Sequence, residues 1–545
     1  MKQLALVAII TAAPVLAQAR PAQPRVRSAV AESLDVVISG ARIIDGTGRA
    51  SFLGDVGVQG GWIARVTQPG GLRSRPARKR LDGRGLVVAP GFIDVHSHTV
   101  DAIITPERRW NEGVIRQGVT TVLGGPDGGY ALDRMKHVVD AIWKNGAGTN
   151  VALYVGHNGI RRAVLGPAQR APNVEELERM KAMVREGMEM GAVGLSSGLM
   201  YEPGMFSTTE EVVELAKEVA PYRGIYDSHV RDPVKRFLWS DEECLAIGER
   251  AGIAPKIGHE KAVGLENAGK IKDVIAMVNA ARLRGVDAVS DQYPYDGAAT
   301  STLTGIIVVP EELRTQPGFD LKAALRDPAT RARLKATSEN GINGGFAWLK
   351  ATGYSSMRIT TSPEQPALVG KYLSELARER GVEGFDLVSD LIVAASQPIG
   401  ITLGAIKEDD VRLLMKQPWN MIASDGGYAD AKSTTMGHPR STGTFPRVLG
   451  HYVREVKLFS LEEAVRKMTS LPADWSGLRD RGRIFEGQAA DLVIFDPRII
   501  ADRSTWEKPS AMPVGVRDVL VNGVLVLEAG EMTGKAPGRY LRARR

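Results

Sequence analysis

One short stretch of the chain reads Ala89-Pro90-Gly91-Phe92-Ile93-Asp94-Val95-His96-Ser97-His98, an apolar run that ends in two histidines. Side chains alternate along a β-strand, so His96 and His98 are expected on the same face of a strand that ends here. Two neutral imidazoles placed side by side are suitable ligands for zinc. A His-x-His pair is weak evidence by itself, and the rest of the chain must supply the context.

Seven more apolar runs follow, most of them separated by amphipathic stretches of helical period. Runs of this kind that alternate with helices are typical of parallel βα units. Eight such units predict an α/β protein with a closed (β/α)8 TIM barrel, whose chemistry gathers at the C-terminal ends of the strands. The eight expected strands are 87–98, 120–127, 151–157, 192–197, 224–229, 254–259, 286–295 and 420–425.

Polar residues with metal-binding or proton-transfer chemistry end several of these runs. His157 ends the third run, His229 the fifth, His259 the sixth and Asp425 the eighth. With the His-x-His pair, five of the eight histidines lie where a barrel places its active site. A buried structural role is the default for any single histidine, but several groups at one rim favour a metal site.

The segments outside this pattern predict additional structure. Residues 300–416 exceed what one connecting helix requires, which indicates an inserted subdomain or lid with helices near 320–337, 370–380 and 409–416. Residues 30–88 and 485–535 contain short β-type stretches broken by turn signals. We expect these two segments to pair into one small β-sandwich beside the barrel of residues 89–484.

The first nineteen residues have the pattern of a secretory signal. Met1-Lys2-Gln3 precedes an apolar run over 4–16 and the small-x-small sequence Ala17-Gln18-Ala19. The alternative is a membrane anchor, but the run is shorter than the ~20 apolar residues that span a bilayer. We therefore expect cleavage after Ala19, export to the periplasm or medium, and no membrane association afterwards.

The basic charge balance does not indicate a nucleic-acid partner. The formal net charge is +7, and the basic residues cluster at 73–80 and in the tail at 539–545 without interleaved aromatics. We expect a solvated surface and a frayed tail. The single cysteine, Cys244, excludes an intramolecular disulfide, and the sequence leaves the oligomeric state open.

The context of the first strand resembles the amidohydrolase superfamily, whose first barrel strand ends in Pro-Gly-hydrophobic-Ile-Asp-x-His-x-His. Further blocks resemble the N-acyl-D-amino-acid deacylase (D-aminoacylase) family, and the resemblance spans residues 34–532. These blocks are residues 191–204, Tyr226-Asp227-Ser228-His229-Val230-Arg231-Asp232, Gly258-His259-Glu260-Lys261, Asp291-Gln292-Tyr293-Pro294-Tyr295 and residues 438–447, which begin His438-Pro439-Arg440.

The resemblance implies a zinc centre. His229 and His259 would hold the tight Zn²⁺, while His96, His98 and Asp425 would surround a second, weaker or vacant position. The family usually ends its second strand with a metal-binding cysteine, where this chain has Asp127. A carboxylate can replace a thiolate on zinc but makes the site harder, which leaves the metal and the number of ions open. The alternative for Asp127 is a turn residue before Gly128.

A related subclass is disfavoured. Hydantoinase-like relatives carry a lysine on the fourth strand that is carboxylated and bridges two metals, and this chain has Ser196-Ser197-Gly198 there.

The resemblance also implies a reaction and a substrate. The expected reaction is hydrolysis of N-acyl-D-amino acids by metal-activated water, with Asp425 as general acid and base. Lys261 and Arg440 match family positions that receive the substrate carboxylate, and Tyr201 and Tyr293 would donate hydrogen bonds beside them. His157 ends the third run but is not a metal ligand in the family pattern, and from its position we expect it either to line the pocket or to orient a ligand.

Two other functions stay open: another amidohydrolase-type enzyme, such as a dipeptidase, lactonase or cyclic amidase, and a non-catalytic binding protein on the same barrel. The preference for D or L substrates and for particular side chains and acyl groups also stays open.

Overall fold

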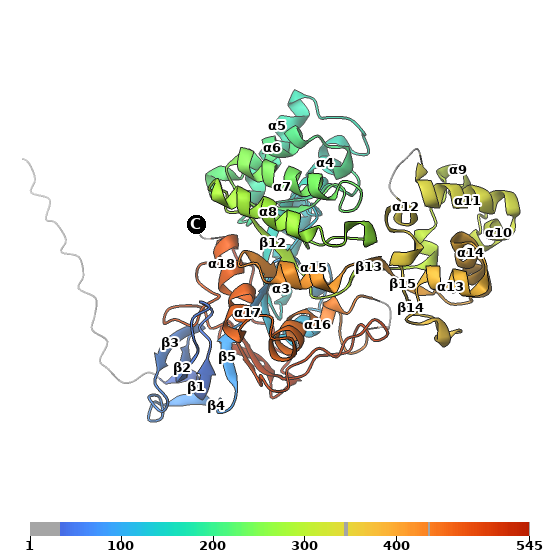
Figure 1. Cartoon of the computed structure of the whole chain (residues 1–545). Coiled ribbons are helices and arrows are strands. Elements are labelled where there is room, and N and C mark those ends of the chain that lie inside the picture. Colours follow the sequence, from blue (N-terminus) through green and yellow to red (C-terminus); the bar gives the residue numbers. More distant parts are fainter. Residues whose placement is uncertain (1–32, 343–346, 434–436, 544–545) are drawn as a thin grey trace, which may run out of the picture.

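The computed structural model describes residues 33–342, 347–433 and 437–543, and its centre is an eight-stranded parallel barrel sheet (Figure 1). Neighbouring strands pair in chain order, and the two edges approach each other through backbone hydrogen bonds from Asp425 N to His96 O (2.9 Å) and from His98 N to Gly426 O (2.9 Å). The predicted (β/α)8 barrel is confirmed. Its strands are β6 (Phe92–Asp94), β7 (Val119–Gly124), β8 (Asn150–Gly156), β9 (Gly194–Gly198), β10 (Ile225–His229), β11 (Ala254–Ile257), β12 (Val289–Gln292) and β16 (Asn420–Ile422).

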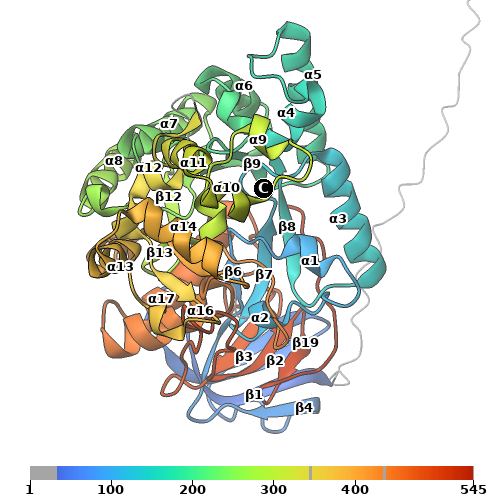
Figure 2. The same ribbon diagram turned by 90° about the vertical axis from the view of Figure 1, so that its right-hand side faces the viewer.

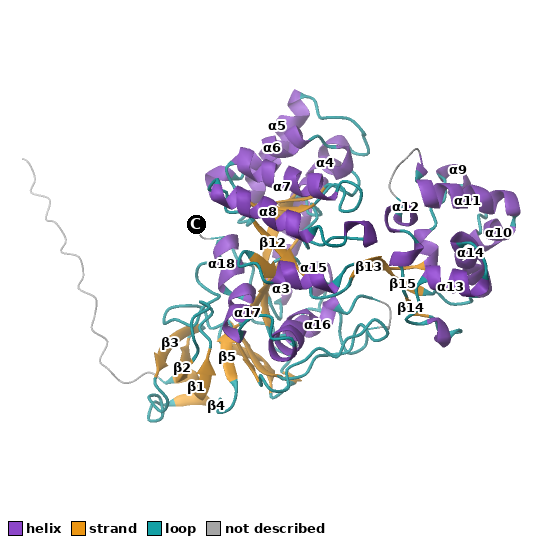
Figure 3. Cartoon of the chain, in the orientation of Figure 1, coloured by secondary structure: helices purple, strands orange, loops and turns teal. Residues whose placement is uncertain are grey.

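Helices cover the outside of this sheet (Figure 3). The start of α5 (Val174–Glu189) shows why the chain turns helical where it does: the Asn173 side chain accepts from Glu176 N, and the Glu176 carboxylate accepts from Asn173 N, which is a complete capping box. The helices between consecutive strands are α1 (Val100–Ile103), α2 (Glu112–Ile115), α3 (Leu132–Asn145), α4 (His157–Leu165), α5 (Val174–Glu189), α6 (Thr209–Lys217), α7 (Phe237–Ala251) and α8 (Ile271–Leu283), with α15 (Glu408–Met415) before the last strand.

The expected first strand is divided in the structure. Residues 87–98 form two strands, because β5 (Val87–Pro90) pairs with strands of the terminal sheet and only β6 belongs to the barrel. The chain crosses between the two sheets at Gly91, where a Cβ atom would lie 2.2 Å from the Thr120 side chain. Only glycine permits this close approach of the backbone to β7.

Both ends of the chain form a second, nine-stranded sheet at the foot of the barrel (Figure 2). Its strands β5 and β17 pair antiparallel, which joins the N-terminal strands to the C-terminal ones. Ile38 and Ile494, from opposite ends of the chain, lie in one hydrophobic cluster. The other strands are β1 (Leu34–Ile43), β2 (Phe52–Gln59), β3 (Trp62–Thr67), β4 (Ala77–Asp82), β17 (Leu492–Phe495), β18 (Val516–Val521), β19 (Val524–Glu528) and β20 (Glu531–Met532).

The long connection between β12 and β16 carries a separate three-stranded sheet with helices around it, to the right of the barrel in Figure 1. Phe385 and Ile401 are among the buried side chains of its own hydrophobic cluster. The expected helix at 409–416 corresponds to α15, which packs on α8 and β16 and so forms part of the barrel wall. The inserted elements are β13 (Gly297–Thr302), α9 (Glu311–Arg314), α10 (Leu321–Arg326), α11 (Pro328–Asn340), α12 (Trp348–Thr352), β14 (Ile359–Thr361), α13 (Leu373–Arg380), α14 (Gly384–Ala394) and β15 (Gly400–Ala405).

The C-terminal tail is bound to the barrel over its described residues. Val151 N donates to Arg539 O (2.9 Å) and Leu541 N donates to Val151 O (2.8 Å), at the first residues of β8. The prediction of a frayed tail is therefore wrong up to residue 543. The expected signal at 1–19 lies outside the described residues, and within those residues no helix is long and apolar enough to cross a membrane.

Candidate metal centre and active site

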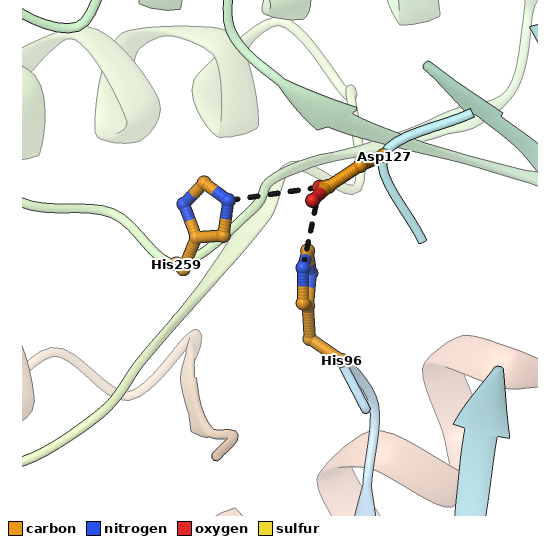
Figure 4. Close-up of side chains that lie close together, drawn as sticks. All are labelled: His96, Asp127 and His259. Atoms are coloured by element: carbon orange, nitrogen blue, oxygen red, sulfur yellow. Dashed lines mark ion pairs between the residues drawn. The ribbon is translucent and has the colours of Figure 1, made fainter. Parts of the chain in front are cut away.

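Four side chains converge on Asp127 at the C-terminal ends of the barrel strands. Oδ1 of Asp127 lies 3.3 Å from His96 Nε2, 3.7 Å from His229 Nδ1 and 3.7 Å from His259 Nε2, while Oδ2 lies 3.5 Å from His98 Nε2. Figure 4 shows the side chains of His96, Asp127 and His259 pointing toward one another. The structure thus brings together residues that are up to 163 positions apart, from 96 to 259.

Asp425 completes a second group with the His-x-His pair. Its Oδ1 lies 3.1 Å from His98 Nε2 and 3.7 Å from His96 Nε2. Two triads follow, His96–Asp127–His259 and His96–His98–Asp425, and in each the ligand atoms lie within 4.8 Å of one another. Because His96 belongs to both triads, the two positions are adjacent.

These donors fit a divalent cation such as zinc. Both ring nitrogens of His96 and Oδ1 of Asp127 are buried and make no hydrogen bond within the described chain. Buried polar atoms are nearly always paired, so unpaired ones that face each other indicate a missing partner. Imidazole nitrogens and carboxylate oxygens are ordinary zinc ligands.

Three of these residues have left-handed backbone conformations. The φ angles are 57° at Asp127, 39° at His259 and 47° at Asp425. Non-glycine residues seldom adopt this region, and such strain is retained where the surrounding structure enforces it. Here it turns each chain segment just past its strand so that the side chain faces the common centre.

The protonation of two of the histidines suits metal binding. Burial lowers the pKa of His229 to about 4, and burial with the charge of Lys261 lowers the pKa of His259 well below its usual range. Burial opposes charge on His96 as well, but Asp127 and Asp227 raise its pKa to about 9. Burial also opposes charge on Asp127, yet the neighbouring histidines, His96 first, hold its pKa well below its usual range. His229 and His259 are therefore neutral, as zinc ligands must be.

Cationic and phenolic groups lie on one side of the centre. Arg440 Nη1 is 2.7 Å from Asp425 Oδ2, and Lys261 Nζ is 2.7 Å from His259 Nδ1. Both cations lie over the ring of Tyr293, at 4.7 and 5.3 Å from its centroid. Tyr201 OH lies 3.2 Å from His229 Nδ1. These four residues are thus grouped beside the candidate metal ligands, as the sequence predicts.

His157 is placed elsewhere. It is the first residue of α4, and its buried Nε2 lies 2.9 Å from Glu211 Oε1 on α6. The same carboxylate pairs with the fully buried Arg161. The expectation that His157 lines the pocket is not met, because the chain turns directly into a helix there and the ring faces the helix layer.

Three buried charged residues below the site have no counterpart among the predicted residues. Lys256 Nζ lies 3.0 Å from Asp227 Oδ1 and also pairs with Asp291. Asp227 Oδ2 lies 3.7 Å from His96 Nδ1, and Asp291 accepts from His259 N. The cluster therefore supports two candidate metal ligands from beneath. The alternation of side chains along β10 could have identified Asp227 from the sequence, because Asp227 and His229 lie on the same face of the strand.

A cavity of about 640 Å³ opens beside the centre. Asp425, His438 and Arg440 line it, together with the loop around Tyr428 and with Pro509 from the C-terminal region. A small polar molecule that reaches Asp425 would thus also meet Arg440.

Comparisons with known proteins agree with this geometry. Residues 324–527 match the model of the amidohydrolase family. The chain is 34% identical to a D-aminoacylase of Alcaligenes xylosoxydans xylosoxydans, with 94% of this chain and 98% of that protein covered. A crystal structure of N-acyl-D-glutamate deacylase from Bordetella bronchiseptica, complexed with zinc and a phosphonate mimic of the tetrahedral intermediate, is similar with a TM-score of 0.74 and 33% identity (94% of this chain, 100% of that one).

A further similar structure concerns metal stoichiometry. It is a D-aminoacylase with a binuclear metal centre, in which one metal activates and the second attenuates (TM-score 0.73, 32% identity, 93% of this chain and 100% of that one).

Proposed function

This chain belongs to the D-aminoacylase family of the amidohydrolases, and we propose that it hydrolyses the amide bond of N-acyl-D-amino acids to a carboxylate and a free D-amino acid. The observation that carries the proposal is the position of Arg440. Its guanidinium reaches Asp425 at the edge of the histidine cluster, so a carboxylate on the substrate would find a cation next to the group that handles protons. A fork of N–H donors is suited to a carboxylate.

The proposal includes a metal at the histidine cluster. His229 and His259 with Asp127 would hold the tight Zn²⁺, and His96, His98 and Asp425 would surround a weaker second position. When bound, zinc supplies a Lewis acid that polarises the amide carbonyl and acidifies water. One oxygen of Asp127 lies near His96, His229 and His259, and the other lies near His98. Asp127 would therefore contribute to both proposed metal positions.

Asp425 would transfer the proton during the reaction. Burial alone would raise its pKa, but Arg440 and the neighbouring histidines hold it well below its usual range, so the carboxylate is ionised at neutral pH. It would accept a proton from the attacking water as the new C–O bond forms and deliver that proton to the amide nitrogen as the C–N bond breaks. The second proton of the water leaves with the new carboxylic acid and passes to the amine, so the products are a carboxylate and an ammonium, and Asp425 ends ionised.

Lys261 and Tyr201 would complete the recognition of the substrate, and Tyr293 would hold the two cations in place. Burial lowers the pKa of Lys261 to about 8, so the protonated form of its side chain still predominates at neutral pH. Tyr293 OH donates to Ala298 O (2.6 Å), which holds its ring beneath both cations.

The test is hydrolysis of paired N-acetyl-D- and N-acetyl-L-amino acids by zinc-reconstituted protein, with zinc content measured on the same sample. We expect turnover of the D-isomers only, and loss of turnover after chelation that zinc restores. Dipeptides and lactones, assayed in parallel, test the alternative enzymes. Absence of turnover on either isomer at full zinc content would overturn the substrate assignment. An Asp425→Ala variant separates an enzyme from a binding protein, because only catalysis needs the carboxylate.

We further propose that residues 1–19 direct export and are removed. The support is the sequence pattern of a short charged start, an apolar run and the Ala17-Gln18-Ala19 site. The test is the N-terminal sequence of the protein recovered from the periplasm. A mature protein that begins at Arg20 is expected, and an uncleaved chain retained in the cytoplasm would contradict the proposal.

A further inference from the structure

A segment from the C-terminal region lies against the start of helix α16 (Arg440–Arg447), whose first residue is Arg440. Its two ends pair through Ala501 and Val514. Ser504 Oγ donates to Pro439 O (3.0 Å), and Thr442 Oγ1 donates to Pro509 O (2.9 Å). Residues 501–514, which follow β17, are thus tied on both sides of Arg440, although they belong to the part of the chain that forms the terminal sheet.

His438 is the centre of this contact. Its ring lies 4.5 Å from that of Trp506, 5.4 Å from Tyr293 and 5.6 Å from Tyr295, measured between centroids. Nε2 lies 3.0 Å from Gly297 O, and Nδ1 accepts from Arg440 N (3.1 Å). These partners require a neutral ring with its proton on Nε2. Burial and the charge of Arg440 keep the pKa of His438 well below its usual range, which agrees with a neutral ring.

Trp506 is itself held by residues at the start of the insertion. Its Nε1 donates to Asp296 Oδ1 (3.1 Å), the residue just before β13, and the Arg358 guanidinium lies 5.3 Å from its ring centroid. A Cβ atom on Gly297 would lie 2.6 Å from the Trp506 ring, so the indole packs directly on the β13 backbone. One tryptophan therefore contacts the insertion on one side and His438 on the other.

Arg440 depends on the same strand. Its Nη1 donates to Ala298 O (3.2 Å) as well as reaching Asp425, while His438 binds the preceding carbonyl of Gly297. The backbone of Arg440, through His438, and its guanidinium, directly, are thus both held in place by backbone carbonyls of β13. A shift of the His438 ring would move the backbone of Arg440 relative to Ala298 and Asp425.

We propose that Trp506, acting through His438, is a positioning residue that fixes Arg440 for the substrate carboxylate. The inference rests on the proposed function, because it assigns Arg440 to that carboxylate. Trp506 itself does not contact the reacting atoms. A guanidinium fork is effective only when its direction is fixed, so loss of Trp506 should weaken substrate binding and leave kcat unchanged at neutral pH or above, where Asp425 stays ionised.

The experiment compares Trp506→Ala, Trp506→Phe and wild type on an N-acetyl-D-amino acid, with kcat, KM and zinc content measured for each. We expect Trp506→Ala to raise KM about tenfold or more with kcat within about twofold and zinc content unchanged. Trp506→Phe keeps an aromatic ring against His438, so its KM should be close to that of wild type. Glu507→Ala, an exposed neighbour, is the matched control and should behave as wild type.

An unchanged KM in Trp506→Ala would overturn the proposal, and so would a fall of kcat together with zinc content, which indicates general damage. If Trp506→Ala does not fold, Arg358→Met removes the outer contact of Trp506 together with the pair that Arg358 forms with Asp296 (3.8 Å). It should raise KM in the same direction by a smaller factor, and an unchanged KM would overturn the proposal. If wild type lacks turnover, the proposed function fails, and the same variants are then compared by calorimetric binding of the N-acetyl-D-amino acid to zinc-loaded protein.

Discussion

Arg440 Nη1 lies 2.7 Å from Asp425 Oδ2, while the other oxygen of that carboxylate lies 3.1 Å from His98 Nε2. The carboxylate is thus bound by a permanent cation on one side and by a candidate metal ligand on the other. Asp425 can act as a base only when it is ionised, and Arg440 is the leading charge that keeps it so against the effect of burial.

Replacement of Arg440 by methionine should therefore change the pH dependence of kcat. Without the positive charge the protonated form of Asp425 becomes more favourable, its pKa rises, and the acidic limb of the profile moves to higher pH. Activity at mildly acidic pH should fall first. Arg440→Lys keeps the charge and should keep the limb in place while raising KM, because lysine provides one point of contact instead of a fork. An acidic limb that is the same in all three proteins would contradict the prediction.

Asp127 should determine how tightly the metal binds. Asp127→Ala removes a carboxylate whose oxygens lie 3.3 to 3.7 Å from the four histidines, and we expect the zinc dissociation constant to rise by roughly a hundredfold or more. Asp127→Cys, which introduces the thiolate usual in the family, should retain tight zinc. The measurement is competition with a chromophoric chelator. Full zinc affinity in Asp127→Ala would favour the alternative that Asp127 is only a turn residue.

Lys256 should contribute to both stability and metal binding. Lys256→Met leaves Asp227 and Asp291 buried without their cation, which should cost about 3 kcal/mol or more of unfolding free energy. Because Asp227 lies against His96 and Asp291 holds His259 N, zinc affinity should also fall about tenfold or more. The measurements are the unfolding midpoint in urea of metal-free protein and a zinc titration.

Lys217→Met is the matched control, since Lys217 forms an exposed pair with Glu214. Its effect on unfolding should stay below about 1 kcal/mol. Equal effects of the two substitutions would show that the buried cluster has no special role.

Removal of residues 535–545 should lower stability without changing the chemistry. The tail pairs with Val151 at the start of β8, and Tyr540 OH donates to Met190 O (3.2 Å), whereas the histidines lie past the other end of the strands. We expect a lower unfolding midpoint with kcat and zinc content unchanged. Lys535→Ala, an exposed substitution, is the control. Loss of zinc in the truncated protein would contradict this separation of the two ends of the barrel.

The sequence predicts the barrel and most residues of the centre because both depend on local rules. Apolar runs that end in polar residues mark strand ends, and the ends of parallel strands share a rim. This places His96, His229, His259 and Asp425 together without knowledge of any contact. The departure at Asp127 is visible only through the resemblance, because the family has a cysteine at the position where this chain ends its second run.

Other features are decided by contacts that no local pattern contains. The division of the first strand at Gly91 depends on Thr120 from the next strand. His157 fits the strand-end rule, but its ring binds Glu211 from a helix 54 residues later. Trp506 has no local signal at all, because its role follows from packing on His438 and β13.

The terminal sheet has a consequence for how the protein is made. β5 finds its antiparallel partner β17 only after about 400 further residues have left the ribosome. Until then a row of unpaired backbone amides and carbonyls stays exposed along β5, and such an edge is prone to wrong pairing. The edge of β5 is therefore covered only late in synthesis, when β17 becomes available.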